Sequence, residues 1–116
     1  MDLTTQQSLQ IWRGAFVDSV RRDTPDLTAR QMAVLTTVYL DPPPHTVRGL
    51  AEDLSISKPA ITRALDRLSA LGLVRRKADE TDRRSITVQR TVKGSLYLSD
   101  FAELIARAAA ALPPPG

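Results

Sequence analysis

Basic side chains are concentrated in the middle of this chain of 116 residues. Residues 47–93 contain eleven Lys and Arg against six Asp and Glu, whereas the remaining residues contain five against seven. Lys and Arg neutralise phosphate groups, and an Arg guanidinium can also pair with O6 and N7 of guanine. The distribution therefore indicates that the middle of the chain binds an anionic partner such as a nucleic acid.

The sequence contains few side chains that could support catalysis, disulfide formation or metal binding. The chain has no cysteine, which excludes disulfides, thiol catalysis and cysteine-bound zinc. His45, the only histidine, follows three prolines, and we expect a solvated loop residue there rather than a metal ligand. Since the sequence shows no nucleophile–base pair, phosphate-binding loop or metal cluster, we predict no enzymatic activity, no cofactor and no metal ion.

The sequence also predicts neither a membrane-spanning segment nor a secretion signal. Its apolar stretches are short and interrupted by charges, and its first residues lack the basic and apolar regions of a signal peptide. Together with the missing cysteines, this favours a cytoplasmic protein.

The segment after Ser57 predicts a helix with one apolar and one polar side. Ser57 is a good N-cap, Pro59 is tolerated in the first turn, and Gly72 can adopt the positive φ that ends a helix. The apolar side is formed by residues spaced four, three and three apart: Ile61, Leu65, Leu68 and Leu71. The residues that we predict to contact DNA from this helix are Ser57, Lys58, Pro59, Thr62, Arg63 and Arg67. Arg63 is the best candidate for a base contact.

A β-hairpin with a charged tip is predicted directly after Gly72. Residues 73–77 and 85–89 have the character of strands, and residues 78–84 form a polar loop between them. Taken alone, the basic run of the first strand is typical of an ordinary solvated surface, but its place beside the capped helix favours DNA contact. Arginines suit the negative potential of a narrow minor groove. The residues that we predict to contact DNA from this hairpin are Arg75, Lys77, Arg83, Arg84 and Ser85.

Further helices are predicted on both sides of this pair of elements. Apolar residues at helical spacing indicate a first helix over residues 4–22, and Thr28 with Gln31 forms a capping box for a second helix through residue 40. Three prolines then form a rigid linker, after which Thr46 caps a short third helix. A last helix covers residues 94–112, and residues 113–116 form a frayed tail.

This order of elements predicts a winged helix-turn-helix, which is a mainly α fold with a small antiparallel β-hairpin (α+β). The length of the chain predicts one domain over residues 1–116. Its DNA-binding core is expected at residues 28–93, with the wing at residues 73–90. The helices before and after this core are the candidate dimerisation elements.

Residues 28–94 resemble the core of a MarR-family regulator in an ordered series of short stretches. These stretches are LTARQ at 27–31, LAEDL at 50–54, SKPAITRALDRL at 57–68, LGLVRR at 71–76, DRR at 82–84 and TVKG at 91–94. The resemblance implies that Arg84, which closes the Asp-x-Arg signature of the wing, contacts DNA and pairs with Asp66 of the recognition helix. It also implies that Asp82 orders the wing loop. Family members usually carry proline where this chain has Val92, and they usually continue beyond the helix after the wing.

The same resemblance implies a sequence-specific regulator that binds double-stranded DNA as a homodimer. Such regulators usually repress transcription at a pseudo-palindromic operator and are released by a small-molecule effector, often aromatic or anionic. The residues that we expect at the dimer interface are Leu9, Trp12, Phe16, Phe101 and Ile105. An alternative function that the sequence leaves open is a winged helix that binds protein partners without specific DNA binding.

Overall fold

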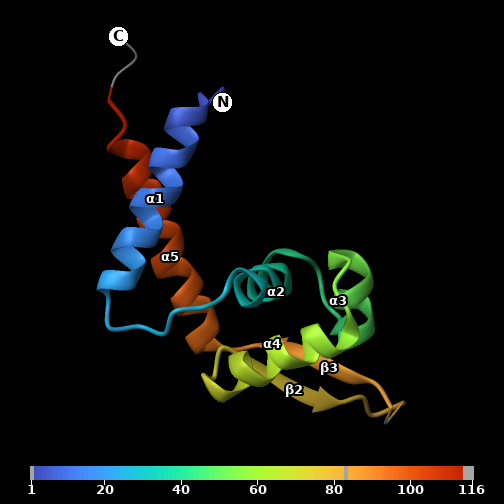
Figure 1. Ribbon diagram of the computed structural model, residues 1–116. Coiled ribbons are helices and arrows are strands. Elements are labelled where there is room, and N and C mark those ends of the chain that lie inside the picture. Colours follow the sequence, from blue (N-terminus) through green and yellow to red (C-terminus); the bar gives the residue numbers. More distant parts are fainter. Residues whose placement is uncertain (1, 83, 114–116) are drawn as a thin grey trace. The chain divides into compact units, whose positions relative to one another are not determined.

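The elements of the computed structural model follow the order of a winged helix (Figure 1). The structure describes residues 2–82 and 84–113. The elements are α1 (Thr5–Arg21), α2 (Ala29–Leu40), β1 (His45–Thr46), α3 (Val47–Leu54), α4 (Lys58–Ala70), β2 (Val74–Ala78), β3 (Ile86–Arg90) and α5 (Val92–Ala110). The predicted α+β fold class is therefore confirmed. Among the described residues, no helix is long and apolar enough to span a membrane.

The helices begin where side chains satisfy their first free N–H groups. Thr28 and Gln31 form the predicted capping box of α2, with hydrogen bonds of 3.0 and 3.1 Å. Ser57 caps α4 by accepting a hydrogen bond of 3.3 Å from Ala60 N. Between α3 and α4, Ser55 adopts a left-handed conformation with φ of 53°, which is uncommon for a residue other than glycine. The predicted positive φ of Gly72 is confirmed at 76°.

The core around α4 is built from the side that the periodicity predicted. Ile61, Leu65 and Leu68 are fully buried, while Leu71 at the end of the helix is half-buried. α2 packs on α4, and its apolar residues Leu35 and Val38 are fully buried. Further core residues come from α2, α3, the sheet and the residue just before β2: Val34, Leu50, Val74, Val88 and Leu73. The core therefore dictates which side of α4 faces solvent.

The sheet has three antiparallel strands in the order β1-β3-β2, one more than the sequence predicted. The additional strand β1 pairs His45 with Val88 of β3. The expectation that His45 is a solvated loop residue is wrong, because this pairing draws it into the protein and leaves it 8% exposed. Its Nε2 lies 3.1 Å from the carbonyl oxygen of Asp41 at the end of α2. β2 and β3 form the predicted hairpin, and each begins one residue later than expected.

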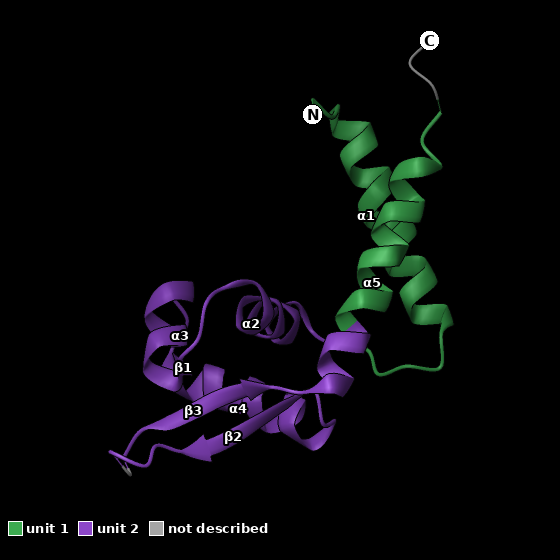
Figure 2. Cartoon of the chain, turned by 180° about the vertical axis from the view of Figure 1, so that it is seen from behind, with its two compact units in different colours: residues 1–26, 98–116 green, residues 27–97 purple. Residues whose placement is uncertain are grey.

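Contacts between residues group into two compact units, shown in Figure 2. Unit 1 comprises residues 1–26 and 98–116, and unit 2 comprises residues 27–97. We expected one domain for the whole chain. The expected DNA-binding core, residues 28–93, lies entirely in unit 2, and the candidate dimerisation helices lie in unit 1 except for the first residues of the second helix. α5 is continuous and contributes its first residues to unit 2 and its remainder to unit 1.

Unit 1 is held together by the packing of α1 against the second part of α5. The rings of Phe16 and Phe101 meet edge to face with centroids 5.4 Å apart. Ala15 of α1 and Leu104 of α5 are buried between the helices. At Gly14 the helices approach so closely that an added Cβ would lie 3.0 Å from the Cβ of Ala108. Small residues thus allow the two helices to lie side by side.

Of the glycines in unit 2, Gly94 in the first turn of α5 has the least room for a side chain. An added Cβ there would overlap the carbonyl oxygen of Leu73 and the hydroxyl group of Tyr39. A helical glycine ordinarily costs about 1 kcal/mol relative to alanine. The close packing therefore requires glycine here, because a side chain would separate α5 from α2 and from the start of β2.

Gly94→Ala is expected to lower the free energy of unfolding by about 1–3 kcal/mol, because the added methyl group must displace backbone or the Tyr39 ring. Urea unfolding followed by circular dichroism measures this change. Ser95→Ala, at the exposed next residue, is the control and should change stability by less than about 0.5 kcal/mol. A Gly94→Ala protein as stable as the unaltered chain would show that this close approach does not exist.

Candidate nucleic-acid interface

The side of α4 that faces solvent carries the predicted DNA-contacting residues. Lys58, Pro59, Thr62, Arg63 and Arg67 are all exposed. Ser57 is exposed too, but its hydroxyl oxygen already accepts the hydrogen bond that caps α4. The polar side of α4 can therefore meet a ligand along its length, with the positive end of the helix dipole at Lys58.

Two cations of β2, Arg75 and Lys77, are exposed but have polar partners within the hairpin. The guanidinium group of Arg75 donates hydrogen bonds of 3.3 and 3.0 Å to Oε1 of Gln89 on β3. Nζ of Lys77 lies 3.7 Å from a carboxylate oxygen of Glu80. Arg83, which we also predicted to contact DNA, lies outside the described residues. Exposed pairs of this kind are weak, so Arg75 and Lys77 can exchange these partners for phosphate groups.

A basic concavity of about 620 Å³ brings α3, α4 and the wing loop together. Lys58 comes from α4, and Arg84 and Ser85 come from the wing loop, so two sets of predicted site residues meet here. Arg48 of α3 also lines the concavity, and sequence reasoning missed it. The signal was available, because Arg48 is in the first turn of the helix that precedes the turn of the helix-turn-helix. We call this feature the basic concavity.

The acidic residue on the exposed side of α4 pairs with a different arginine from the one expected. Oδ1 of Asp66 lies 2.7 Å from Nη1 of Arg76 on β2. The predicted pairing of Asp66 with Arg84 is wrong: α4 packs against β2, whereas Arg84 lies in the loop and lines the basic concavity. Asp66 nevertheless joins α4 to the wing, and Arg76 balances its charge. Arg84 is thereby left for other contacts.

Two aspartates order the wing loop. Asp82 accepts a hydrogen bond of 3.0 Å from Arg84 N and one of 3.3 Å from the hydroxyl group of Ser85. These are contacts that suit the loop-ordering role expected of Asp82. Asp79 accepts hydrogen bonds from Thr81 N at 2.9 Å and from the Thr81 hydroxyl at 2.8 Å. The backbone N–H of Thr81, and then its hydroxyl, hold the pKa of the Asp79 carboxyl below its ordinary value.

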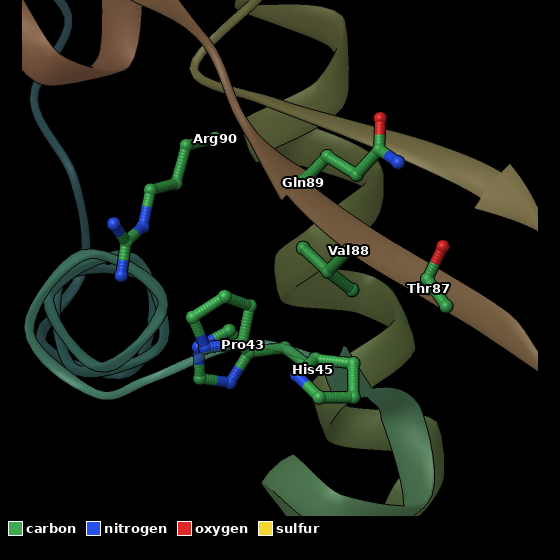
Figure 3. A pocket seen from close by; sticks show the side chains of 7 residues that line it. Pro43, His45, Thr87, Val88, Gln89 and Arg90 are labelled. Atoms are coloured by element: carbon green, nitrogen blue, oxygen red, sulfur yellow. The ribbon is translucent and has the colours of Figure 1, made fainter.

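A second cavity, of about 280 Å³, lies between the proline linker and β3 (Figure 3). Several polar side chains along it already bond to the protein. Arg90 reaches from β3 to α2, where its Nε donates to the carbonyl oxygen of Val38 at 2.9 Å. Gln89 accepts from Arg75, and His45 bonds to Asp41. This cavity therefore belongs to the structural connection between α2 and β3.

The expected dimerisation residues divide into two groups in unit 1. Leu9 and Trp12 are each 62% exposed and Ile105 is 42% exposed, which is unusual for large apolar side chains. Phe16 and Phe101 are half-buried because they pack against each other. Trp12 also contacts Phe16, with ring centroids 4.5 Å apart. The first group thus presents large apolar side chains to solvent, and Phe16 of the second group packs against Trp12 of the first.

In the described part of the chain, no three His, Asp or Glu side chains come together as a metal site would require.

The comparisons with known proteins concern both the sequence and the fold. A sequence model of the MarR family matches residues 26–85. The fold is similar to that of the transcriptional repressor CouR bound to a 23-mer DNA duplex, with 27% identity and a TM-score of 0.70 over 90% of this chain and 71% of CouR. A mutant MarR from E. coli matches with 26% identity and a TM-score of 0.70 over 90% of this chain and 73% of its own. The S. aureus MepR–DNA complex matches in fold with 20% identity and a TM-score of 0.66 over 88% and 75% of the two chains.

The contacts of Asp79 predict how the wing loop responds to pH. Because its folded pKa is lowered, these contacts stabilise the folded protein above the pKa that Asp79 has in the unfolded chain. The contribution is lost as the pH falls through the lowered folded value. Thr81→Val removes the hydroxyl donor but keeps the backbone donor, so the pKa of Asp79 should rise partway towards its ordinary value.

This rise is measured by following the Asp79 carboxyl carbon by NMR as the pH is lowered. Thr87→Val is the matched control, because the Thr87 hydroxyl bonds to the carbonyl oxygen of Lys77 and not to Asp79. An unchanged midpoint in Thr81→Val would contradict the proposed cause of the shift.

Proposed function

The chain belongs to the MarR family, and from this premise we propose that it is a transcription regulator that binds double-stranded DNA with α4 and the wing. The basic concavity carries this proposal, because Lys58 of α4 and Arg84 of the wing loop line it together. A recognition helix and a wing that share one basic surface can contact a major groove and the adjacent backbone at the same time.

α4 is the element that we place in the major groove. Its exposed side presents Thr62 and Arg63 one turn after the N-terminus, where recognition helices meet base edges. Arg63 has the five donors needed for a bidentate contact with guanine. Arg67, one turn further along α4, and Lys58 at its start are suited to phosphate groups on either side. Specificity would then depend mainly on Arg63 and Thr62.

The wing loop is the element that we place against the minor groove and the phosphate backbone. Among the described residues, no ion-pair partner is seen for the Arg84 guanidinium. Asp82 accepts hydrogen bonds from the backbone N–H groups of Arg84 and Ser85. A narrow minor groove concentrates negative potential and attracts arginine. Arg48 in the same concavity supplies a further cation for the backbone.

The exposed apolar surface of unit 1 supports a homodimer. Leu9, Trp12 and Ile105 would lose contact with water if a second copy covered them. Two copies related by a two-fold axis would read a pseudo-palindromic operator with half-sites about 34–36 Å apart. By analogy with CouR, a transcriptional repressor bound to DNA, we propose that the dimer represses transcription. The family resemblance further supports release by a small-molecule effector.

Substitution of the two arginines tests the DNA-binding proposal. Arg63→Ala should weaken binding to a preferred duplex by about 1–3 kcal/mol and reduce the preference for that duplex over random sequence. Arg84→Ala should weaken binding to every duplex and lower the slope of log affinity against log salt by about one. Fluorescence anisotropy at several salt concentrations measures both effects, with duplexes selected from a random-sequence library.

Arg30→Ala is the matched control, since it removes an exposed arginine from α2 and should leave binding unchanged. The double variant Arg63→Glu with Arg84→Glu separates this proposal from a winged helix that binds proteins. If that variant binds duplexes as well as the unaltered chain, DNA is not the partner of this surface.

Trp12→Glu tests the dimer. The unaltered chain should sediment as a dimer, and the substitution should shift it towards the monomer because a buried, unpaired carboxylate at the interface is costly. Analytical ultracentrifugation at several concentrations measures the shift. Ser8→Glu adds the same charge at another exposed residue of α1 and should leave the dimer intact. A Trp12→Glu protein that dimerises as strongly as the unaltered chain would place the interface elsewhere.

A further inference from the structure

One hydroxyl group joins both ends of the wing to α2. The Tyr39 hydroxyl oxygen accepts a hydrogen bond of 2.8 Å from Thr91 N. The hydroxyl has two acceptors for its own proton. The carbonyl oxygen of Leu73 lies 3.0 Å away and that of Thr91 lies 2.8 Å away. Leu73 immediately precedes β2 and Thr91 immediately follows β3. The Tyr39 side chain of α2 therefore bonds to the residues at both ends of the hairpin.

The start of α5 is joined to the same point through Thr91. The Thr91 hydroxyl donates a hydrogen bond of 2.7 Å to the carbonyl oxygen of Gly72 and accepts one of 2.9 Å from Gly94 N. Gly94 has no space for a side chain, because Leu73 and Tyr39 lie against it. The end of α4, the two ends of the wing and the first turn of α5 thus meet around the Tyr39 hydroxyl. We call this cluster the wing junction.

Arg90, the last residue of β3, adds a second connection to α2. Its Nε and Nη2 donate hydrogen bonds of 2.9 Å to the carbonyl oxygens of Val38 and Asp41 at the end of that helix. Its guanidinium carbon also lies 5.9 Å from the centre of the Tyr39 ring. Figure 3 shows the side chain reaching across to α2. Because none of these contacts involves the Tyr39 hydroxyl, that hydroxyl can be removed without removing them.

Away from its base, the wing is held by the pairing of β1 with Thr87 and Val88 of β3, by α4 packing against β2, and by few buried side chains. Of the five residues of β2, only Val74 is buried, and in β3 only Val88 is. The ion pair of Arg76 with Asp66 is exposed to solvent and therefore weak. A strand of five residues is about 17 Å long, so a tilt of about 10° at the base moves the tip by about 3 Å. That displacement equals the length of a hydrogen bond and exceeds the tolerance of about 0.5 Å of a preorganised site.

From these contacts we propose that Tyr39 is a positioning residue for DNA binding, whose hydroxyl sets the direction in which the wing leaves the protein. The proposal rests on the proposed function, since it concerns how the wing meets DNA. Tyr39 itself does not touch DNA. Its hydroxyl acts through Leu73 and Thr91 on the loop that carries Arg84.

A double-mutant cycle in DNA binding tests the proposal. Tyr39→Phe keeps the ring and removes the hydroxyl, and we expect about tenfold weaker binding to a selected duplex. In the Tyr39→Phe background, Arg84→Ala should weaken binding little further, because the wing is already misplaced. Arg63→Ala should weaken binding as much in this background as in the unaltered chain.

Thr36→Val, the control, removes a hydroxyl of α2 that bonds to Met32 within the same helix, and binding should stay within about twofold. Full additivity of Tyr39→Phe with Arg84→Ala would overturn the proposal.

A measurement without DNA separates this proposal from the proposed function. Because the chain has no cysteine, Ala33→Cys on α2 and Glu80→Cys in the wing loop can carry two spin labels at exposed positions. Labelled protein is diluted with unlabelled protein so that only distances within one chain are measured. The distance distribution should be narrow with Tyr39 present, broader or shifted with Tyr39→Phe, and unchanged with Thr36→Val.

An identical distribution in the Tyr39→Phe protein would refute the positioning role, even if the unaltered chain binds DNA. If the unaltered chain binds no duplex but its wing is displaced by Tyr39→Phe, the proposed function fails while the role of Tyr39 in placing the wing stands.

Discussion

The burial of one side of α4 is the constraint on which the rest of the molecule depends. Ile61, Leu65 and Leu68 are fully buried, and truncation of such a side chain typically costs about 2–5 kcal/mol. These residues therefore prevent the helix from rotating about its axis. With that rotation fixed, Thr62 and Arg63 must face solvent, whatever their own interactions contribute. The polar side of α4 is thus determined by apolar packing on the opposite side.

The wing is held in place by a different kind of interaction. It buries few side chains, and polar contacts at its base and along its loop determine its position. Such contacts are directional, so they hold an angle well but contribute little stability each. The covalent path of α5 from unit 2 into unit 1 begins at the same place, next to Thr91.

Local patterns in the sequence were sufficient to predict the parts of the fold that local interactions determine. The spacing of Ile61, Leu65 and Leu68, the cap at Ser57 and the positive φ of Gly72 each involve residues close together in the chain. The features that were missed depend on distant residues. His45 is buried because it pairs with Val88, and Asp66 meets Arg76 because β2 packs along α4. Arg48 was missed although its place in the first turn of α3 could have indicated it, and its position beside the wing loop follows from the fold.

The central claim is that α4 and the wing form one DNA-binding surface. An NMR titration of the isotopically labelled chain with a duplex selected from a random-sequence library tests it most directly. The account predicts that the largest amide shifts cluster in residues 57–67 and 75–85 and at Arg48, and that they diminish together as salt is raised. Shifts centred on α1 and the second part of α5, with residues 57–67 unaffected, would contradict it.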